Sequence, residues 1–326
     1  MRKKYKYKGA FKNDAAFWGQ HLTADHIVSV KEKMKAVTGD NHAFVVQDLY
    51  SKLKCLYPVP TKDSADTAAS IRHFVGDRMV RRLYSDNSGE IGAALKKVGI
   101  MPHNSLPGEP QTNAFAERNN GDILEGTRAA LVRAGLPACM WSFAAGHYCH
   151  MENTHYSYDS HSPWYHTHGE EFSGEFIHFG AKVIFRPSDT KETNIGKMDP
   201  PTLTGIFAGY ELNYGYQWNK TYMVWALDDF ANVDLSADAV INKTQLRVPH
   251  RTQTVEIPPE GLVFPLKAEY ERKNHTLEGV TEKYLASHGG LGFPGDADLD
   301  AQSGHPGGVD RWLPVGKQWY RIHSNP

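Results

Sequence analysis

The chain has few cysteines, no long apolar run and almost no net charge, and each of these absences excludes a class of protein. Three cysteines are too few and too scattered for a disulfide framework, which favours a reducing compartment. No apolar run is long enough to span a bilayer, which argues against a membrane protein. The basic run Arg2–Lys4 is followed by Tyr, Lys and Gly rather than by an apolar segment, so the sequence predicts no signal peptide. We therefore expect an intracellular protein.

A net charge of −1 is low for a dedicated nucleic-acid binder, but the charge is unevenly distributed. Residues 1–12 hold six basic residues and no acidic one, interleaved with three aromatic residues. Such an arm can neutralise phosphates and stack on bases, with Lys3 and Lys4 as candidate contacts; the alternative is a solvated terminus. A second basic cluster precedes residue 86 and consists of Arg72, Arg78, Arg81 and Arg82.

The length of 326 residues predicts two folded domains. In the first domain, over residues 15–165, three β-prone runs are followed by a helix-prone run and then by another β-prone run. We expect strands or hairpin arms at 22–28, 37–46, 55–59 and 80–85, with a helix at 64–75 after the third of them. Pro58 marks the strand at 55–59 as an edge strand.

Beyond residue 174 the pattern becomes that of an all-β domain, which we expect over 174–250. Runs at 181–185, 205–210, 220–225 and 238–241 are strand-like and favour a small barrel or meander. Residues 251–326 contain several Gly- and Pro-rich segments, which predict a linker or a partly disordered tail.

Three acidic residues far apart in the chain stand in contexts that suit metal ligands. Asp25 lies within a strand-like run, Asp86 closes another, and Glu117 opens a helical stretch after the turn-rich residues 106–111. Two carboxylates on strands and one on a helix can converge on a pair of divalent cations, which together promote in-line phosphoryl transfer. Oxygen ligands suit Mg²⁺ or Mn²⁺ rather than zinc. The alternative for each residue alone is a turn former or a helix cap.

The sequence around these acidic residues resembles the catalytic core of retroelement integrases, in particular the copia-type branch. The resemblance rests on an ordered series of blocks that includes residues 84–90, 111–119, 135–141 and 205–210. It extends over roughly residues 15 to 245. It implies an α/β, ribonuclease-H-like fold, in which helices flank a mixed sheet, within a fragment of a retrotransposon polyprotein.

The resemblance also implies an activity, namely DNA integration by two-metal phosphodiester cleavage and strand transfer. Asp25, Asp86 and Glu117 would be the catalytic metal ligands, with Mg²⁺ or Mn²⁺ as the cofactor. Asp48 matches a recurrent family position that is not a ligand, and it is the main rival to Asp25. The partners would be the element's DNA ends and a target DNA, bound by a homo-oligomer that acts in the nucleus.

Further residues near Glu117 are candidate contacts to DNA. Gln111 and Asn113, expected in the turn before the helix, can hydrogen-bond to a DNA end. Arg118 follows Glu117 directly. Arg128 lies eleven positions after Glu117, on the same helix face, where it could hold a phosphate; the alternative is a pairing with Glu125.

Three features depart from the usual pattern of the integrase family. Asn119 and Asn120 follow Arg118 where the family is often more basic. Asp86 and Glu117 are 31 positions apart, a few fewer than is common, and Ala114 stands where a glycine is usual. If that position needs a positive φ, alanine there costs on the order of 1 kcal/mol. These departures motivate an alternative, a catalytically decayed or domesticated remnant that only binds nucleic acid.

Histidine is abundant between residues 147 and 178, where seven occur. With two cysteines nearby, a zinc site is one interpretation. No Cys-x-x-Cys pair or matched histidine pair fixes a tetrahedral geometry, however, so the spacing favours structural roles.

Overall fold

The computed structural model of the chain describes residues 15–28, 35–86, 88–104, 110–155, 161–187 and 198–287, together with the backbone of 311–315 and 318–322. The side chains of residues 102–104 and 110–114 lie outside this description. The chain divides into two units, residues 1–279 and residues 280–326. In the second unit, β11 (Arg311–Val315) pairs antiparallel with β12 (Gln318–Ile322). None of the described helices has the length and apolar character needed to cross a membrane.

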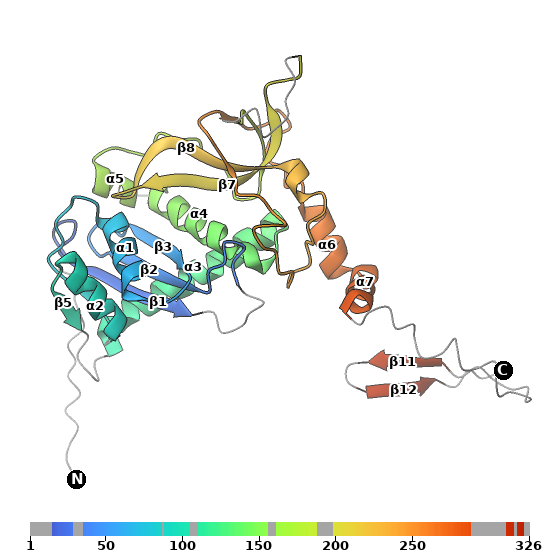
Figure 1. The fold of residues 1–326 in the computed structure, drawn as a ribbon, viewed down its shortest axis with the longest axis horizontal. Helices are drawn as coiled ribbons and strands as arrows, with labels where there is room; N and C mark the ends of the chain where they lie inside the picture. Colours follow the sequence, from blue (N-terminus) through green and yellow to red (C-terminus); the bar gives the residue numbers. More distant parts are fainter. Residues whose placement is uncertain are drawn as a thin grey trace, which may run out of the picture. The chain divides into compact units, whose positions relative to one another are not determined.

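The first unit begins with a five-stranded mixed sheet in the order β3-β2-β1-β4-β5 (Figure 1). Three strands are antiparallel, namely β1 (Leu22–Val28), β2 (His42–Asp48) and β3 (Lys54–Val59). The other two run parallel to β1, namely β4 (Leu83–Ser85) and β5 (Pro102–Asn104). This topology confirms the predicted ribonuclease-H-like fold class.

Helices cover both faces of this sheet because its strands alternate their apolar side chains between the faces. Leu22, Phe44 and Val46 form one core with α1 (Ser64–Val75) and α2 (Gly89–Val98). The intervening residues Ala43 and Val45 form another with α3 (Pro110–Ala134) and α4 (Trp141–Thr154). Asp63 and Ser88 cap α1 and α2, each accepting a backbone hydrogen bond.

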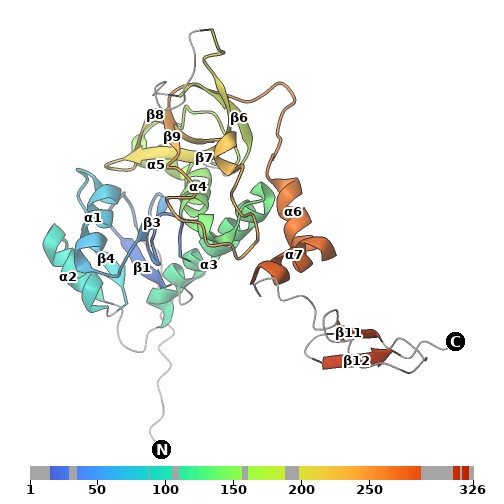
Figure 2. The same ribbon diagram turned by 45° about the vertical axis from the view of Figure 1, so that its right-hand side comes forward.

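A second sheet, entirely antiparallel, lies against the other side of α4 in the order β10-β6-β7-β8-β9. Figures 1 and 2 both show β7 and β8 lying along α4, on the side away from the first sheet. The strands are β6 (Lys182–Phe185), β7 (Leu203–Asn213), β8 (Gln217–Ala226), β9 (His250–Thr252) and β10 (Val255–Glu256). The sheet confirms the expected all-β region. The boundaries proposed for the two domains stay a prediction.

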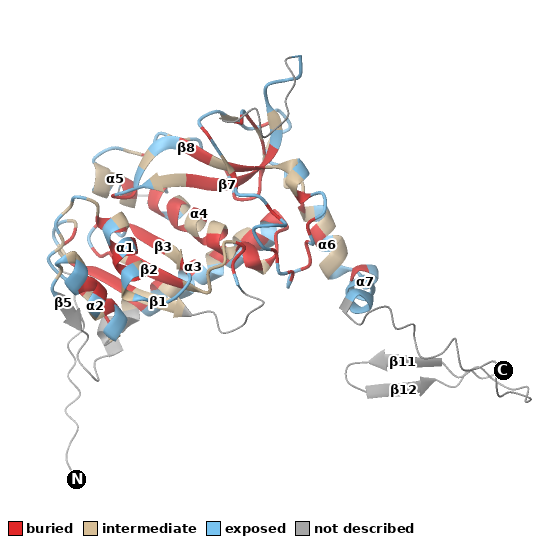
Figure 3. Cartoon of the chain, in the orientation of Figure 1, coloured by how far each residue is buried: buried red, intermediate tan, exposed pale blue. Residues whose placement is uncertain are grey.

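The remaining described elements are short helices. They are η2 (Ala138–Met140), α5 (Pro163–His168), η3 (Leu227–Phe230), α6 (Lys267–His275) and α7 (Leu277–Ser287). Figure 3 shows that buried residues concentrate on α4 and on the strands facing it, so this helix lies at the centre of the unit.

Hydrogen bonds made by α4 connect the turn between β7 and β8 to the first sheet. Asn153, fully buried on α4, bonds to both the backbone N and O of Lys54 in β3 and to the hydroxyl of Tyr216. The turn between β7 and β8 also docks on the end of α1, because Gly215 N donates to His73 O at 2.7 Å. A Cβ on Gly76 would lie 2.6 Å from the Cα of Gly215, so this contact is between bare backbones.

Two of the expected strand segments are wrong. Residues 238–241 form turns instead of a strand, since Ala239 N bonds to Ser236 O and Ile241 is buried without strand pairing. The expected hairpin over 37–46 has only its second arm. Its turn is present at Gly39, but β2 pairs with β1 and β3 rather than with residues 37–38. Pro58 does lie in an edge strand, as predicted.

Candidate active site

Asp25 and Asp86 lie side by side because of the register between two parallel strands. β1 and β4 pair with Thr23 opposite Tyr84, and the same register continued by two residues sets Asp25 beside Asp86. Neighbouring strands are about 4.8 Å apart, which brings the two carboxylates together just beyond the end of β4. Asp25 points to the α3 and α4 face, since it lies opposite Val45 of β2.

The carboxylate of Asp25 is half-buried and held from two sides. Its Oδ1 accepts from the backbone N of His26 at 2.8 Å, and its Oδ2 accepts from Nδ2 of Asn120 on α3 at 2.9 Å. Burial raises the pKa of Asp25 above its ordinary value, and the charge of Asp86 raises it further, against the lowering effect of the two hydrogen bonds. Oδ1 of Asp86 accepts from the backbone N of Ser88 at 3.1 Å.

Glu117 lies on an exposed part of α3, one helical turn before Asn120. Residues three apart are neighbours on a helix surface, so Glu117 stands next to the position where α3 contacts Asp25. The structure therefore brings Asp25 and Asp86 together, whereas Glu117 lies one helical turn before Asn120, the α3 residue that bonds to Asp25.

The Asp25–Asp86 pair has the character of a site for a divalent cation. The negative charge of Asp86 raises the pKa of Asp25, a cation between the two carboxylates would relieve that repulsion, and oxygen donors suit Mg²⁺ or Mn²⁺. Among the described residues, however, no group of three or more His, Cys, Asp or Glu side chains is arranged to hold a metal ion. The pair thus fits a cation, whereas the role of all three residues as metal ligands stays a prediction.

The rival residue Asp48 has a structural environment. It is fully buried and accepts from the backbone N of Gly19 and from both the N and Oγ of Ser51. In the register of β1 and β2 it lies opposite Leu22, three residues before Asp25. These bonds use its oxygens to close the turn after β2.

The candidate DNA contacts fall into two groups. Arg118 and Arg128 are exposed on α3, and no ion pair joins Arg128 to Glu125. Gln111 and Asn113 lie in the first turn of α3 and not in a preceding turn, because the helix begins at Pro110, a residue favoured at that position. Their side chains, like Lys3 and Lys4, lie outside the described residues. Ala114 belongs to the same helix, so its backbone is right-handed and needs no glycine.

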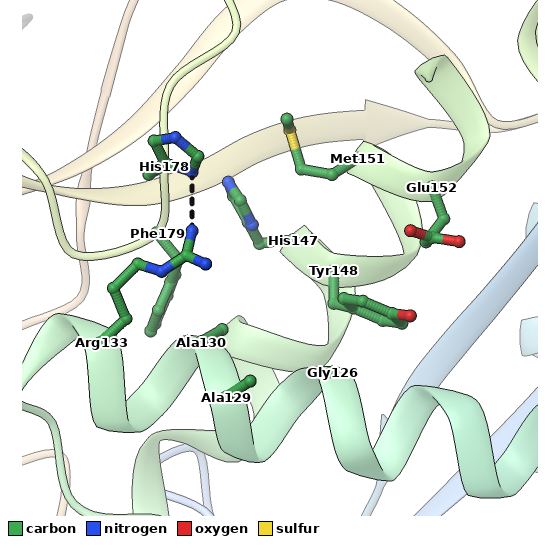
Figure 4. Close-up of a pocket in the computed structure, with 10 residues that line it drawn as sticks. All are labelled: Gly126, Ala129, Ala130, Arg133, His147, Tyr148, Met151, Glu152, His178 and Phe179. Atoms are coloured by element: carbon green, nitrogen blue, oxygen red, sulfur yellow. Dashed lines mark hydrogen bonds between the residues drawn. The ribbon is translucent and has the colours of Figure 1, made fainter. Parts of the chain in front are cut away.

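A cavity of about 240 Å³ lies on the flank of α3 away from Asn120, between α3, α4 and the segment before β6 (Figure 4). Arg133 donates to His178 Nδ1 at 3.3 Å across its rim. None of the predicted site residues lines it. The lining residues are Gly126, Ala129, Ala130, Arg133, His147, Tyr148, Met151, Glu152, His178 and Phe179.

Histidines 147 and 150 have structural surroundings. His147 bonds to Ile177 O at 2.8 Å through Nε2, and His150 is enclosed by the rings of Trp164, Phe172 and Tyr210. Burial lowers the pKa of His147 to about 4. These two histidines therefore belong to the packing around α4.

Known proteins resemble part of this chain. Over 196 residues, or 55% of the chain, it is 29% identical to the retrovirus-related Pol polyprotein from transposon TNT 1-94 of Nicotiana tabacum. Over 114 residues, or 32% of the chain, it is 32% identical to that from transposon RE2 of Arabidopsis thaliana. Homologues of the chain are retrovirus-related Pol polyproteins of plant transposons. The matches cover 14% and 8% of these two proteins, so the chain spans a small part of their length.

The chain was also compared with solved structures and with protein-family models. The catalytic core domain of BIV integrase aligns with 45% of this chain and 91% of its own, at 18% identity and a TM-score of 0.35. No family model matches the sequence.

Sequence reasoning missed Asn120 as part of the site. The sequence marks Asn120 only as a position after Arg118 where the family is often more basic. In the structure its side-chain amide donates a hydrogen bond to Asp25. Its spacing of three residues from Glu117 was the available signal, because it sets both side chains on one side of α3.

Proposed function

We propose that the chain is the integrase part of a retrotransposon polyprotein, and that it cuts and joins DNA at the Asp25–Asp86 pair. The observation that carries the proposal is the adjacency of these two carboxylates across β1 and β4, with α3 tied to the first of them. Similarity to a retrovirus-related Pol polyprotein of a plant transposon supports the assignment to a retrotransposon polyprotein.

The protein's own residues would divide the work as follows. Asp25 and Asp86 would hold a divalent cation between them, and Glu117 would complete the ligand set from α3. Asn120 would fix the orientation of Asp25 through its hydrogen bond. Arg118 and Arg128, exposed on the same helix, would bind the DNA backbone leading away from the carboxylates.

When bound, Mg²⁺ or Mn²⁺ would lower the pKa of an attacking hydroxyl and stabilise the charge that develops on the phosphate. Water would first cleave the phosphodiester near a DNA 3′ end, and the freed 3′-hydroxyl would then attack a target phosphodiester. In the first step a water oxygen would replace the 3′ oxygen on phosphorus, and in the second the freed 3′-hydroxyl would replace an ester oxygen of the target, so no covalent enzyme intermediate is needed. Copies of the chain would act together because two DNA ends are joined to one target.

A strand-transfer assay with Mn²⁺ and a labelled oligonucleotide duplex tests this proposal. We expect joined products from the wild type, and a loss of at least about a hundredfold in Glu117→Gln, which keeps the size of the side chain but removes its charge. Glu125→Gln, exposed on the same helix, is the matched control and should retain activity.

The second candidate is a decayed remnant that binds nucleic acid without catalysis. The lack of a ready three-ligand group among the described side chains favours it. DNA binding by the wild type without joined products would select this candidate, and equal products from wild type and Glu117→Gln would contradict the proposed site.

A further inference from the structure

Two arginines in the segment before β4 stack on two consecutive aromatic rings. The guanidinium of Arg81 lies 4.7 Å from the ring centre of Phe17, and that of Arg78 lies 4.8 Å from the ring centre of Trp18. Arg81 is exposed, and 40% of the Phe17 surface remains accessible. We call these four residues the cation–aromatic platform. Arg81 lies beyond the opposite end of β4 from Asp86, five residues earlier, which is about 16 Å of extended chain at ~3.3 Å per residue.

The platform is rigidly built, because its two segments are bonded to each other. Arg81 N donates to Gly19 O at 2.8 Å, while Gly19 N donates to Oδ1 of Asp48 at 2.9 Å. Gly19 has a φ of +77°, and a Cβ there would lie 2.3 Å from Met79 O. The rings and the guanidinium groups are therefore held in place before any ligand arrives, which reduces the entropy lost on binding.

Arg78 is half-buried yet has no acidic partner. It forms no ion pair with the described residues, and its Nη2 contacts only Nδ1 of His168, at 3.4 Å. Its Nη1 and the Nε1 of Trp18 are buried donors without an acceptor. Asp48 is near enough to influence Arg78 electrostatically, but its oxygens accept from Gly19 and Ser51. A buried cation with unused donors is costly unless an anion neutralises it.

We propose that the cation–aromatic platform binds the phosphate backbone of a nucleic-acid strand at a site separate from the carboxylates. Arg78 and Arg81 bind phosphate oxygens, and the exposed surface of Phe17 stacks on a base. Guanidinium groups match phosphate geometry, and alternating cations and rings form the kind of surface that binds single strands. The basic arm of residues 1–12 leads into this platform along the chain. The inference rests on the proposed function only in naming nucleic acid as the ligand.

The test measures how tightly the full chain binds a fluorescein-labelled 20-nucleotide single strand. Binding is monitored by fluorescence anisotropy, in buffer with EDTA, at salt concentrations from 50 to 300 mM. We expect Arg81→Gln to weaken binding about tenfold at low salt and to reduce the slope of log K against log salt by about 0.7. Phe17→Ala should weaken binding about tenfold with an unchanged slope. Arg247→Gln, an exposed arginine in the same unit, is the matched control and should bind as the wild type does.

Arg78→Lys keeps the charge but loses the forked donors of the guanidinium group. We expect this variant to bind the strand about fivefold more weakly than the wild type does. Binding of Arg81→Gln and Phe17→Ala that equals that of Arg247→Gln would overturn the proposal. Equally strong competition by poly-glutamate of the same charge would overturn the choice of nucleic acid. A wild type that binds no oligonucleotide would instead contradict the proposed function, so the two failures are distinguishable.

Discussion

Nδ2 of Asn120 on α3 lies 2.9 Å from Oδ2 of Asp25 on β1, and this bond connects the helix that carries Glu117 to the strand that carries the first carboxylate. The connection spans 95 positions of sequence. It means that the position of α3 and the orientation of Asp25 are set together.

Replacing Asn120 by alanine should therefore impair catalysis more than folding. We expect joined products to fall about tenfold to a hundredfold, the usual effect of losing a residue that orients a ligand. The free energy of unfolding should fall by only about 1–2 kcal/mol, since one hydrogen bond to a carboxylate is lost. Strand-transfer rates and urea denaturation measure the two effects, and equal activity of Asn120→Ala and wild type would contradict a positioning role.

The backbone contact between Gly76 and Gly215 predicts an unequal response of two similar glycines. Gly76 ends α1 with a φ of +63°, and Gly99 ends α2 with a φ of +74°, so alanine is strained at both. Only at Gly76 would the new Cβ meet a neighbour. We expect Gly99→Ala to cost about 1 kcal/mol and Gly76→Ala about 1–3 kcal/mol more. Urea denaturation of both variants measures the difference, and equal losses would mean that the turn after β7 does not dock on α1.

Buried histidines on α4 predict that the fold weakens in mild acid. Burial lowers the pKa of His147 to about 4, whereas an unfolded histidine has a pKa near 6.5. The unfolded state thus binds more protons between these values, so stability is complete above pH 6.5 and falls as pH drops towards 4. His147 alone should cost about 2 kcal/mol between pH 8 and pH 5.

His150 should add to this loss, because burial lowers its pKa well below the ordinary value and neither of its ring nitrogens has a partner in the described structure. We expect His150→Phe to fit the surrounding aromatic rings and to reduce the difference in unfolding free energy between pH 8 and pH 5. His155→Phe, an exposed change on the same segment, should leave that difference unaltered. Denaturation at the two pH values decides between these outcomes.

Local patterns in the sequence predict several elements to the residue, as in the helix Ser64–Val75 and the strand Leu22–Val28. Both have clear caps or β-prone runs, which act over a few residues. The strand expected at 238–241 failed because Ile241 is buried by distant residues and not by a partner strand. The docking of the second sheet on α4 likewise depends on contacts such as Asn153 with Tyr216, which no local pattern reveals.

In the candidate site, too, local sequence patterns predict some features, whereas contacts between distant residues escape prediction. The context of Asp25 and Asp86 predicts two strand-borne carboxylates, and the parallel register of β1 and β4 sets them side by side. Asn120 escaped prediction because an amide on a helix surface carries no local signal of its partner. The platform of Phe17 and Arg81 escaped too, since the two residues are far apart in sequence and meet only when β4 pairs with β1.

Pro58 makes one edge of the first sheet unfavourable for pairing with another strand. It stands in β3, the outermost strand, where it lacks the N–H that an incoming strand would need to continue the ladder. Edge-to-edge strand pairing between copies of this chain is therefore unfavourable along that edge, even at high concentration. An assembly of copies along that edge would have to form through side chains, which leaves its geometry open to change by single substitutions.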